Sequence, residues 1–549
     1  MYGSAQSEKV VDAILRDQQY METVRSNYET WWRDCAKYYG AEVNWFFPGQ
    51  IAGQNPNTPE VVDSSSRLAL DRYVALISAL SHPKGKKFHT VEASDPSLNR
   101  SRRVKNYFQD VTDVLHRARN NPRARFYSQA YMQKRMWAMF GSSAMMVDEV
   151  VGQNLYYRTP HPREIYQKQN AYGFVDTVHR KFCWPAWKIK QFFNRPTDKL
   201  PPCVDADIKD GKMTQEYEII HSVRPNVDYD PSIKALENRR YRSSYVFRRD
   251  KVEIRVGGYN SFPWSLNRSP GQPEDDYGIP TALLMLPDVK MANTVDRQNI
   301  KTMQLRNAPP ILTHGEGTLR KFKMKPGAII HGGLDGMGKA RVQTLDLGIQ
   351  SEMGMAIAEQ RRQAISSAFL NDVYAVMIQN PNMKATTALA ILQERAQILQ
   401  PTLAMLESEG DGIMIERELE ILDTAGLLPE MPPELLEAGS GYQPVFVSPL
   451  AKAQLAEEAF GAESTVQRAL GVANVNPDIL KEIDWRYYLE VTGESENAPS
   501  RLFRDPEVVA EEKRAQSEQQ ASMVEANNLP AAAGAVLDLA KAKNLADAA

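Results

Sequence analysis

The sequence YGIPTALLMLPDVKMANTVDRQNIKTMQLRNAPP, residues 277–310, predicts a long helix around which the rest of the chain is organised. Pro280 suits the first turn of a helix, and Pro287 allows a kink or a restart. The prolines from Pro309 onward end the helix, because proline cannot continue it. At a rise of about 1.5 Å per residue, residues 288–307 would form a rod of about 30 Å.

This rod carries a basic stripe along one face. At about 100° per residue, Lys290, Arg297 and Lys301 fall within about 40° of one another. A different face carries apolar side chains, namely Val289, Ala292, Ile300 and Met303. The basic side chains are therefore separated from those that a helix ordinarily buries.

A second rod of matching length is expected at residues 349–369, IQSEMGMAIAEQRRQAISSAF, which again spans about 30 Å. The two rods flank a compact β segment from Pro309 to Gly348. A polar loop without glycine, LNDVYAVMIQNPNMKATT, follows the second rod, and then a helix of about forty residues begins near Thr386. Its Pro401 and the Gly410/Gly412 pair predict bends.

The β segment contains a near-match to a phosphate-binding loop. GLDGMGKA, residues 333–340, satisfies G-x-x-x-x-G-K-[ST] except at its last position. Such a loop must leave a strand and enter a helix, yet the sequence after Lys339 alternates like a second short strand. Ala340 also lacks the hydroxyl that would bind Mg²⁺. We interpret the stretch as a turn between strands near 328 and 341, containing Gly333, Gly336, Gly338 and Lys339.

The first half of the chain predicts an α+β fold. Helices are expected over 6–39, 63–80, about 96–118 and 123–140, and short β-like runs with aromatic and β-branched alternation follow from about 145 to 265. This alternation favours an antiparallel sheet over a doubly wound nucleotide-binding sheet. A basic cluster is either a phosphate-binding surface, a solvated helix face or a site of charge pairing between subunits. It comprises Arg100, Arg102, Arg103, Lys105, Arg117, Arg119, Arg123 and Arg125.

Composition argues against several classes of function. The chain has 549 residues, enough for two to four domains, with 42% apolar and 24% charged residues and a net charge of −2. No overall basic field attracts it to nucleic acid or to an anionic membrane. The three cysteines show no metal-binding spacing, and hydrolase motifs, a secretory signal and membrane spans are lacking. We expect a cytosolic protein that is not an enzyme and uses no cofactor or metal.

The order of these elements resembles the portal proteins of tailed bacteriophages, and more specifically the head-to-tail connector family of short-tailed podoviruses. The resemblance covers about residues 10–520. Its supporting segments are DSSSRLALDRYVALISALSHP, FGSSAMMVDE, YGIPTALLMLPDVKMAN, KPGAII, KATTALAILQERAQILQPTLAMLESE, ELEILDTAGLLP and APSRLFRDPEVVAEE.

The resemblance implies a ring of twelve subunits at one capsid vertex, with double-stranded DNA passing through the central tunnel regardless of its sequence. It also implies a division of the chain into a wing with a helical part and a β-rich module (1–280), a stem helix (281–307), a clip (308–348), a second stem helix (349–369), a tunnel loop (370–386), a long wing helix (387–426), and a crown with a C-terminal tail (427–549).

By the same resemblance, the basic stripe of Lys290, Arg297 and Lys301 would face the tunnel or a neighbouring subunit. The tunnel loop would touch DNA through Asn371, Met377, Asn380, Asn382, Met383 and Lys384. The turn with Gly333, Gly336, Gly338 and Lys339 would belong to the clip.

The implied partners are the terminase packaging motor, the major capsid and scaffolding proteins and a tail adaptor protein, with no membrane. The implied location is the portal vertex of the virion, after assembly in the host cytoplasm. Two alternatives stay open: an ATP-driven DNA translocase that uses residues 333–340, and a scaffold or adaptor protein unrelated to DNA.

Overall fold

The computed structural model describes residues 2–40, 61–85, 87–150, 154–233, 235–271, 274–307, 311–313, 337–339, 342–344, 351–372, 400–439, 441–446, 449–473, 479, 482–495, 502, 509 and 511–520. The chain divides into two compact units. Unit 1 comprises Met1–Phe88, Val114–Leu428 and Phe446–Leu450, and unit 2 comprises His89–Asp113, Pro429–Val445 and Ala451–Ala549. Within the expected segment 1–280, residues 89–113 group with unit 2.

The N-terminal helices of unit 1 lie close to the predicted positions. They are α1 (Tyr2–Cys35) with its π-helical extension η1 (Ala36–Gly40), α2 (Ser65–Ser81) and α4 (Phe126–Phe140), while α3 (Arg102–Asn120) divides between the two units. Leu70, Val74 and Ile77 recur at helical spacing on the buried face of α2. Gly141 ends α4 with a φ of 78°, and a Cβ there would overlap the backbone of Gly278.

A β-rich module follows α4. Its strands are β2 (Ser142–Val150), β3 (Asn154–Arg158), β4 (Ile165–Gln169), β5 (Val175–Pro185), β6 (Glu216–Pro225), β7 (Tyr241–Phe247), β8 (Val252–Tyr259) and β9 (Trp264–Arg268). Strands β4 to β8 form one antiparallel sheet in chain order, and β3, β2 and β9 form a second. The predicted α+β class and antiparallel pairing are confirmed.

Helices cover both faces of the five-stranded sheet. On one face Val11 and Ile14 of α1 pack against Ile220 of β6. On the other, α5 (Ala186–Phe192) and α6 (Pro202–Lys209) share a core with Phe182 and other side chains of the sheet. Successive strand residues point to opposite faces, so the aromatic and β-branched alternation predicted from the sequence supplies both contacts.

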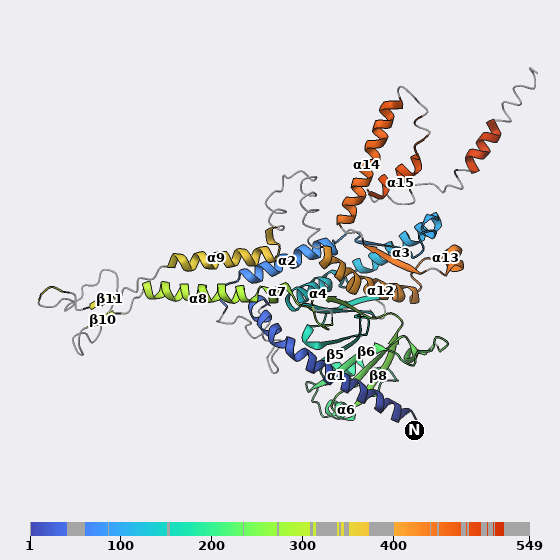
Figure 1. The fold of residues 1–549 in the computed structure, drawn as a ribbon. Helices are drawn as coiled ribbons and strands as arrows, with labels where there is room; N and C mark the ends of the chain where they lie inside the picture. The colour runs from blue at the N-terminus through green and yellow to red at the C-terminus, as the bar shows by residue number, and fades with distance from the viewer. Residues whose placement is uncertain are drawn as a thin grey trace, which may run out of the picture. The chain divides into compact units, whose positions relative to one another are not determined.

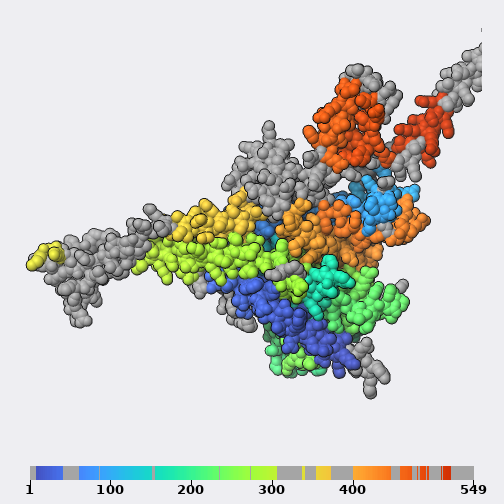
Figure 2. Space-filling model, viewed as in Figure 1, coloured from blue at the N-terminus to red at the C-terminus, as the bar shows by residue number. Residues whose placement is uncertain are grey.

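The two predicted rods are present and lie side by side (Figures 1 and 2). The first is α8 (Leu286–Asn307), preceded by the short α7 (Thr281–Leu284), and the second is α9 (Ser351–Ala368). The stem helix expected from residue 281 is thus interrupted near Met285. Beyond the rods, β10 (Ile311–Thr313) and β11 (Val342–Thr344) pair antiparallel. We call α8 and α9 the helix pair.

A continuous helix runs from Gln400 to Thr424, within the predicted long helix. It contains a π-helical turn, η6 (Leu406–Asp411), followed by α12 (Gly412–Thr424). This irregularity lies at the Gly410/Gly412 pair, where the sequence predicted a bend.

Unit 2 contains a short sheet in which β1 (His89–Ala93) pairs with β12 (Tyr442–Phe446). Its helices include α13 (Pro433–Ala438), α14 (Pro449–Ala473) and α15 (Trp485–Ser495).

Candidate functional site

The helix pair is the most distinctive feature of unit 1, and a glycine permits its close packing. A Cβ placed at Gly354 of α9 would overlap the side-chain amide of Asn299 on α8. Two helices can approach this closely only where one of them lacks a side chain. Gly354 therefore fixes which turn of α9 meets Asn299.

Ion pairs tie the two rods together and to the chain before α2. Arg361 of α9 donates to Asp288 of α8 at 2.9 Å. Arg362 bonds Asp296 of α8, and its Nε lies 3.4 Å from an oxygen of Asp63. Arg362 thus joins three segments, which fixes the rotation of α9 about its axis.

The predicted basic stripe is not uniform. Lys290 donates to Asp34 of α1 at 2.6 Å, and its ammonium lies 5.9 Å from the centre of the Tyr38 ring. Arg297 is half-buried, whereas Lys301 is exposed. The carboxylate that Lys290 contacts belongs to its own chain. The charge of Lys290, the first residue of the stripe, is therefore neutralised within one chain.

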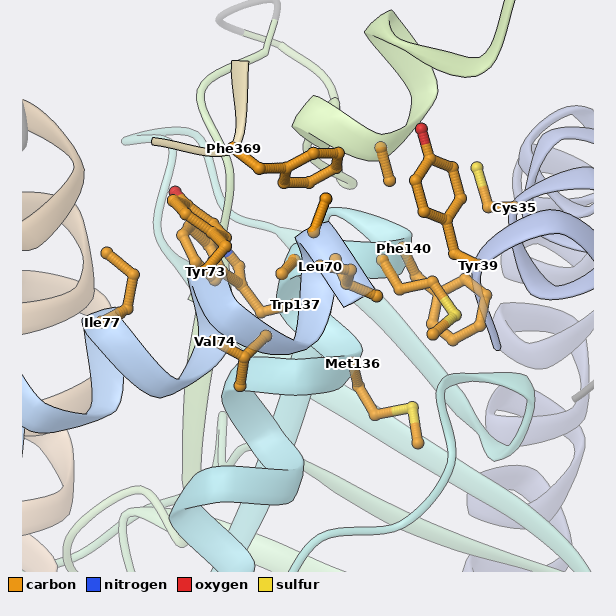
Figure 3. Close-up of a cluster of buried hydrophobic side chains, with 14 of the residues drawn as sticks. Cys35, Tyr39, Leu70, Tyr73, Val74, Ile77, Met136, Trp137, Phe140 and Phe369 are labelled. Carbon is orange, nitrogen blue, oxygen red and sulfur yellow. The ribbon is translucent and has the colours of Figure 1, made fainter. Parts of the chain in front are cut away.

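An aromatic core anchors the base of the helix pair. Phe369, just after α9, is fully buried and packs edge-on against Tyr39 and Tyr73 (Figure 3). The centre of its ring lies 5.7 Å from that of Tyr39 and 5.8 Å from that of Tyr73. Tyr73 in turn stacks on Trp137 of α4 at 6.1 Å. We call these four residues the aromatic core; they fix the end of α9 against η1, α2 and α4.

The chain leaves this core through an unusual junction. Leu370 adopts a left-handed conformation with a φ of 52°, which is costly for a residue with a side chain. Asn371 is only 5% exposed, and its Oδ1 has no hydrogen-bond donor in the part of the chain that the structure describes. Asn371 was predicted to touch DNA, but its side chain is buried beside the core.

The other predicted loop residues lie outside the described residues; they are Met377, Asn380, Asn382, Met383 and Lys384. The same holds for Gly333 and Gly336 of the predicted turn. Gly338 has a φ of 77° with open space around it, and Lys339 is exposed. The chain enters strand β11 three residues after Lys339, as the sequence predicted. Its partner strand is β10 (Ile311–Thr313), and the strand predicted near 328 lies outside the described residues.

Arg119 corrects the prediction for the basic cluster. It is buried and its Nε donates to Glu418 of α12 at 3.0 Å, and the hydroxyl of Tyr157 donates to the same carboxylate at 2.6 Å. Arg119 is therefore neither a phosphate-binding side chain, a solvated residue nor a subunit contact. Its position four residues after the buried Leu115 was the sequence signal for burial.

A second cluster of buried ionisable side chains was not predicted from the sequence. His82, at the end of α2, contacts Lys134 of α4 through Nδ1, and its Nε2 lies 3.2 Å from Asp411 of η6. Burial lowers the pKa of His82 to about 4 and the pKa of Lys134 to about 8. Nothing in the local sequence pattern marks these three residues as neighbours.

The described residues contain neither a group of three or more His, Cys, Asp or Glu side chains placed to hold a metal, nor a helix long and apolar enough to span a membrane. Their most prominent arrangement is mechanical: two antiparallel rods, locked at one end by the aromatic core and joined at the other to a small β element.

Comparison with known proteins agrees with this reading. The family described as "Bacteriophage head to tail connecting protein" matches residues 11–503. The chain is 24% identical over 497 residues to a protein named portal protein from Salmonella phage epsilon15, covering 87% of this chain and 86% of the relative. It is 22% identical over 471 residues to a probable portal protein from Bordetella phage BPP-1, covering 84% and 83%. Because the family match spans nearly the whole sequence, the chain belongs to the bacteriophage head to tail connecting protein family.

Proposed function

We propose that the chain is a portal subunit, a structural protein that forms a ring at one vertex of the capsid and connects head to tail. Family membership and the named relatives support a structural connector role. The observation that carries the proposal is the helix pair, a rod anchored at the aromatic core and joined at its far end to β10 and β11. This geometry suits a wall element repeated around a channel.

The proposal makes the helix pair the stem, β10 and β11 part of the clip, and the β-rich module part of the wing. Repetition of one contact by rotation closes a ring, and we propose twelve copies. Electron micrographs of the purified full chain, viewed down the particle axis, test this directly. A ring with a central hole is expected; monomers or compact particles without a hole would refute it.

Double-stranded DNA would pass through this ring without being read. Firm contacts between a cation and phosphate slow sliding, since each one must be broken at every step. Lys290, Arg361 and Arg362 are each held by a carboxylate of their own chain. A stem neutralised in this way supports free passage of a polyanion.

Arg297 and Lys301, the other two residues of the basic stripe, are proposed to meet DNA or a neighbouring subunit. Reversing Arg297 and Lys301 to Glu should impair DNA retention while rings still form. The charge swap Lys290→Glu with Asp34→Lys is the matched control, because it preserves their ion pair. Failure of the Arg297/Lys301 variant to form rings would assign the stripe to the subunit interface instead.

Residues 370–386 are proposed as the tunnel loop, which constricts around DNA. The support is positional: the segment starts at the junction of Leu370 and Asn371, and the described part of the long helix, from Gln400, follows it in the chain. Deleting residues 376–383 should preserve rings and procapsids but reduce the DNA packaged or retained. Normal full heads from this deletion would eliminate the constriction role.

The proposed partners are the terminase motor and later a tail adaptor at the clip, and the major capsid and scaffolding proteins around the ring. The proposed location is the virion vertex, after assembly in the host cytoplasm. Procapsids assembled without the chain should lack the vertex structure and fail to package DNA.

An ATP-driven translocase is less well supported, because the near-match to a phosphate-binding loop enters strand β11 where a helix N-terminus would be needed. Nucleotide binding by isolated rings would revive this alternative. A scaffold unrelated to DNA would be indicated if the rings formed but mutant phage lacking the chain still filled their heads.

A further inference from the structure

The helix from Gln400 to Thr424 contains one residue more than a regular α-helix of the same length. In η6 the N–H of Gly412 donates to the carbonyl of Glu407, five residues earlier, where an α-helix would use a residue four earlier. Met405 before the turn and Gly412 after it both keep right-handed helical angles. The chain therefore stays helical on both sides of a single π-helical turn.

The two sides of this turn belong to different packing regions. Leu403 and Leu406 lie in the hydrophobic core that includes the aromatic core. Beyond the turn, Ile413 packs with the core of the β-rich module. Glu418 is fixed by Arg119, and Glu420 accepts from the backbone of Ser261 at 3.0 Å. Helix α12 is thus locked to its surroundings by buried charge contacts.

The extra residue in η6 aligns the buried face of the helix before the π turn with the buried face of α12. Counted at about 100° per residue, the mean direction of Leu403 and Leu406 differs from that of Met414, Glu418 and Leu422 by nearly one residue step, about 90°. All five side chains are nonetheless buried. The π turn absorbs one residue and removes the offset, so a shorter, regular helix would place the same side chains inward.

In this helix, low helix propensity and irregular hydrogen bonding coincide at the π turn, which is therefore the place where the helix can bend most easily. Gly410 and Gly412 are poor helix formers, and π hydrogen bonding is rare and mostly confined to single turns at functional positions. The turn is held from outside: Arg268 of β9 donates to Glu409 at 2.7 Å, and Asp411 lies 3.2 Å from His82, whose other ring nitrogen contacts Lys134. A Cβ at Gly410 would also overlap the side chain of Asn267.

We propose that η6 is a conformational joint, and that the contact of Asp411 with His82, which is itself in contact with Lys134, is the latch that holds it in the observed state. When the latch opens, the helix before Leu406 moves with the core at the base of the helix pair, while α12 stays fixed to the β-rich module. The joint would thus separate motion at the base of the helix pair from α12, which goes beyond the proposed portal function.

Hydrogen exchange measured by mass spectrometry on the assembled full chain tests the joint. Asp411→Asn, which keeps the shape of the side chain, should speed exchange of amides 403–412 on the order of tenfold and leave amides 415–424 unchanged. Equal acceleration in both stretches, or none in either, would overturn the latch, because the contact would then be only part of a common core or without effect.

Deletion of the exposed Ser408 is the complementary variant, since it removes the extra residue while the inward faces stay aligned. It should fold, and exchange of amides 403–412 should slow to the rate of α12. Ser408→Ala is the matched control and should resemble the parent chain. If the deletion leaves exchange in 403–412 as fast as in the parent, or accelerates it through α12, the π turn is not a joint.

Discussion

Arg119 of α3 and Glu418 of α12, which are 299 residues apart, form an ion pair in which neither side chain is exposed. The hydroxyl of Tyr157 completes the carboxylate's contacts at 2.6 Å. This group fastens α12 to β3 and to the end of α3. These contacts hold α12, the part of the helix that follows the π turn.

Breaking this group on one side should cost far more than replacing it. Glu418→Leu alone leaves a buried guanidinium unpaired, which typically costs about 3–5 kcal/mol. Glu418→Leu combined with Arg119→Met and Tyr157→Phe should recover most of that loss. Urea denaturation of the single and triple variants measures the difference, and a triple variant no more stable than Glu418→Leu would contradict the expectation.

Gly354→Ala should loosen the helix pair, because the new Cβ would overlap the amide of Asn299. Overpacking of this kind costs about 1–3 kcal/mol. Thermal unfolding should show the loss, and adding Asn299→Ala should restore stability because it removes the overlapping atoms. Gly461→Ala in α14, where a Cβ meets open space, is the control and should not destabilise.

Lys339→Ala should leave DNA packaging unchanged, because Lys339 is an exposed residue that leads into a strand. Gly338→Val should behave differently: its φ of 77° strains a β-branched residue by about 1–3 kcal/mol. Packaging assays on both variants separate the readings. A packaging defect caused by Lys339→Ala with rings intact would restore the nucleotide-binding hypothesis.

Acidification should destabilise the β-rich module through two histidines. Burial lowers the pKa of His179 and of His221 from 6.5 to about 3. The unfolded chain therefore binds protons at these sites before the folded chain does, so stability is full above pH 6.5 and falls as the pH drops toward 3. Urea midpoints measured across this range should flatten in the variant His221→Gln; an unchanged slope would argue against the effect.

Glu407 should act in the opposite direction. Burial, together with the charge of Asp411, raises its pKa from 4.5 to about 7. The folded chain holds this proton more tightly, so the stabilising contribution is present below pH 4.5 and is lost as the pH rises through 7. Glu407→Gln should therefore gain stability relative to the parent at pH 8 and much less at pH 5. Equal effects at both values would refute the shifted titration.

Local patterns were sufficient to predict the helices of the first 140 residues, the two rods, the β-rich module and an irregularity of the long helix at the Gly410/Gly412 pair. Proline and glycine act on the backbone of their own turn, and periods of 3.6 and 2 residues report which face is buried, so Pro309 and the Gly410/Gly412 pair could be read without knowing their neighbours. The strand after Lys339 was predictable for the same reason.

Partners in space were not predictable in this way. The sequence placed Lys290 in a basic stripe and Arg119 in a basic cluster, and the family resemblance implied that Asn371 lies in a DNA-contacting loop. Only the fold brings Asp34 to Lys290 and Glu418 to Arg119, and only the fold buries the side chain of Asn371. The energy of a charge depends on which opposite charge and how much water lie within a few ångströms, and chain folding over hundreds of residues decides both.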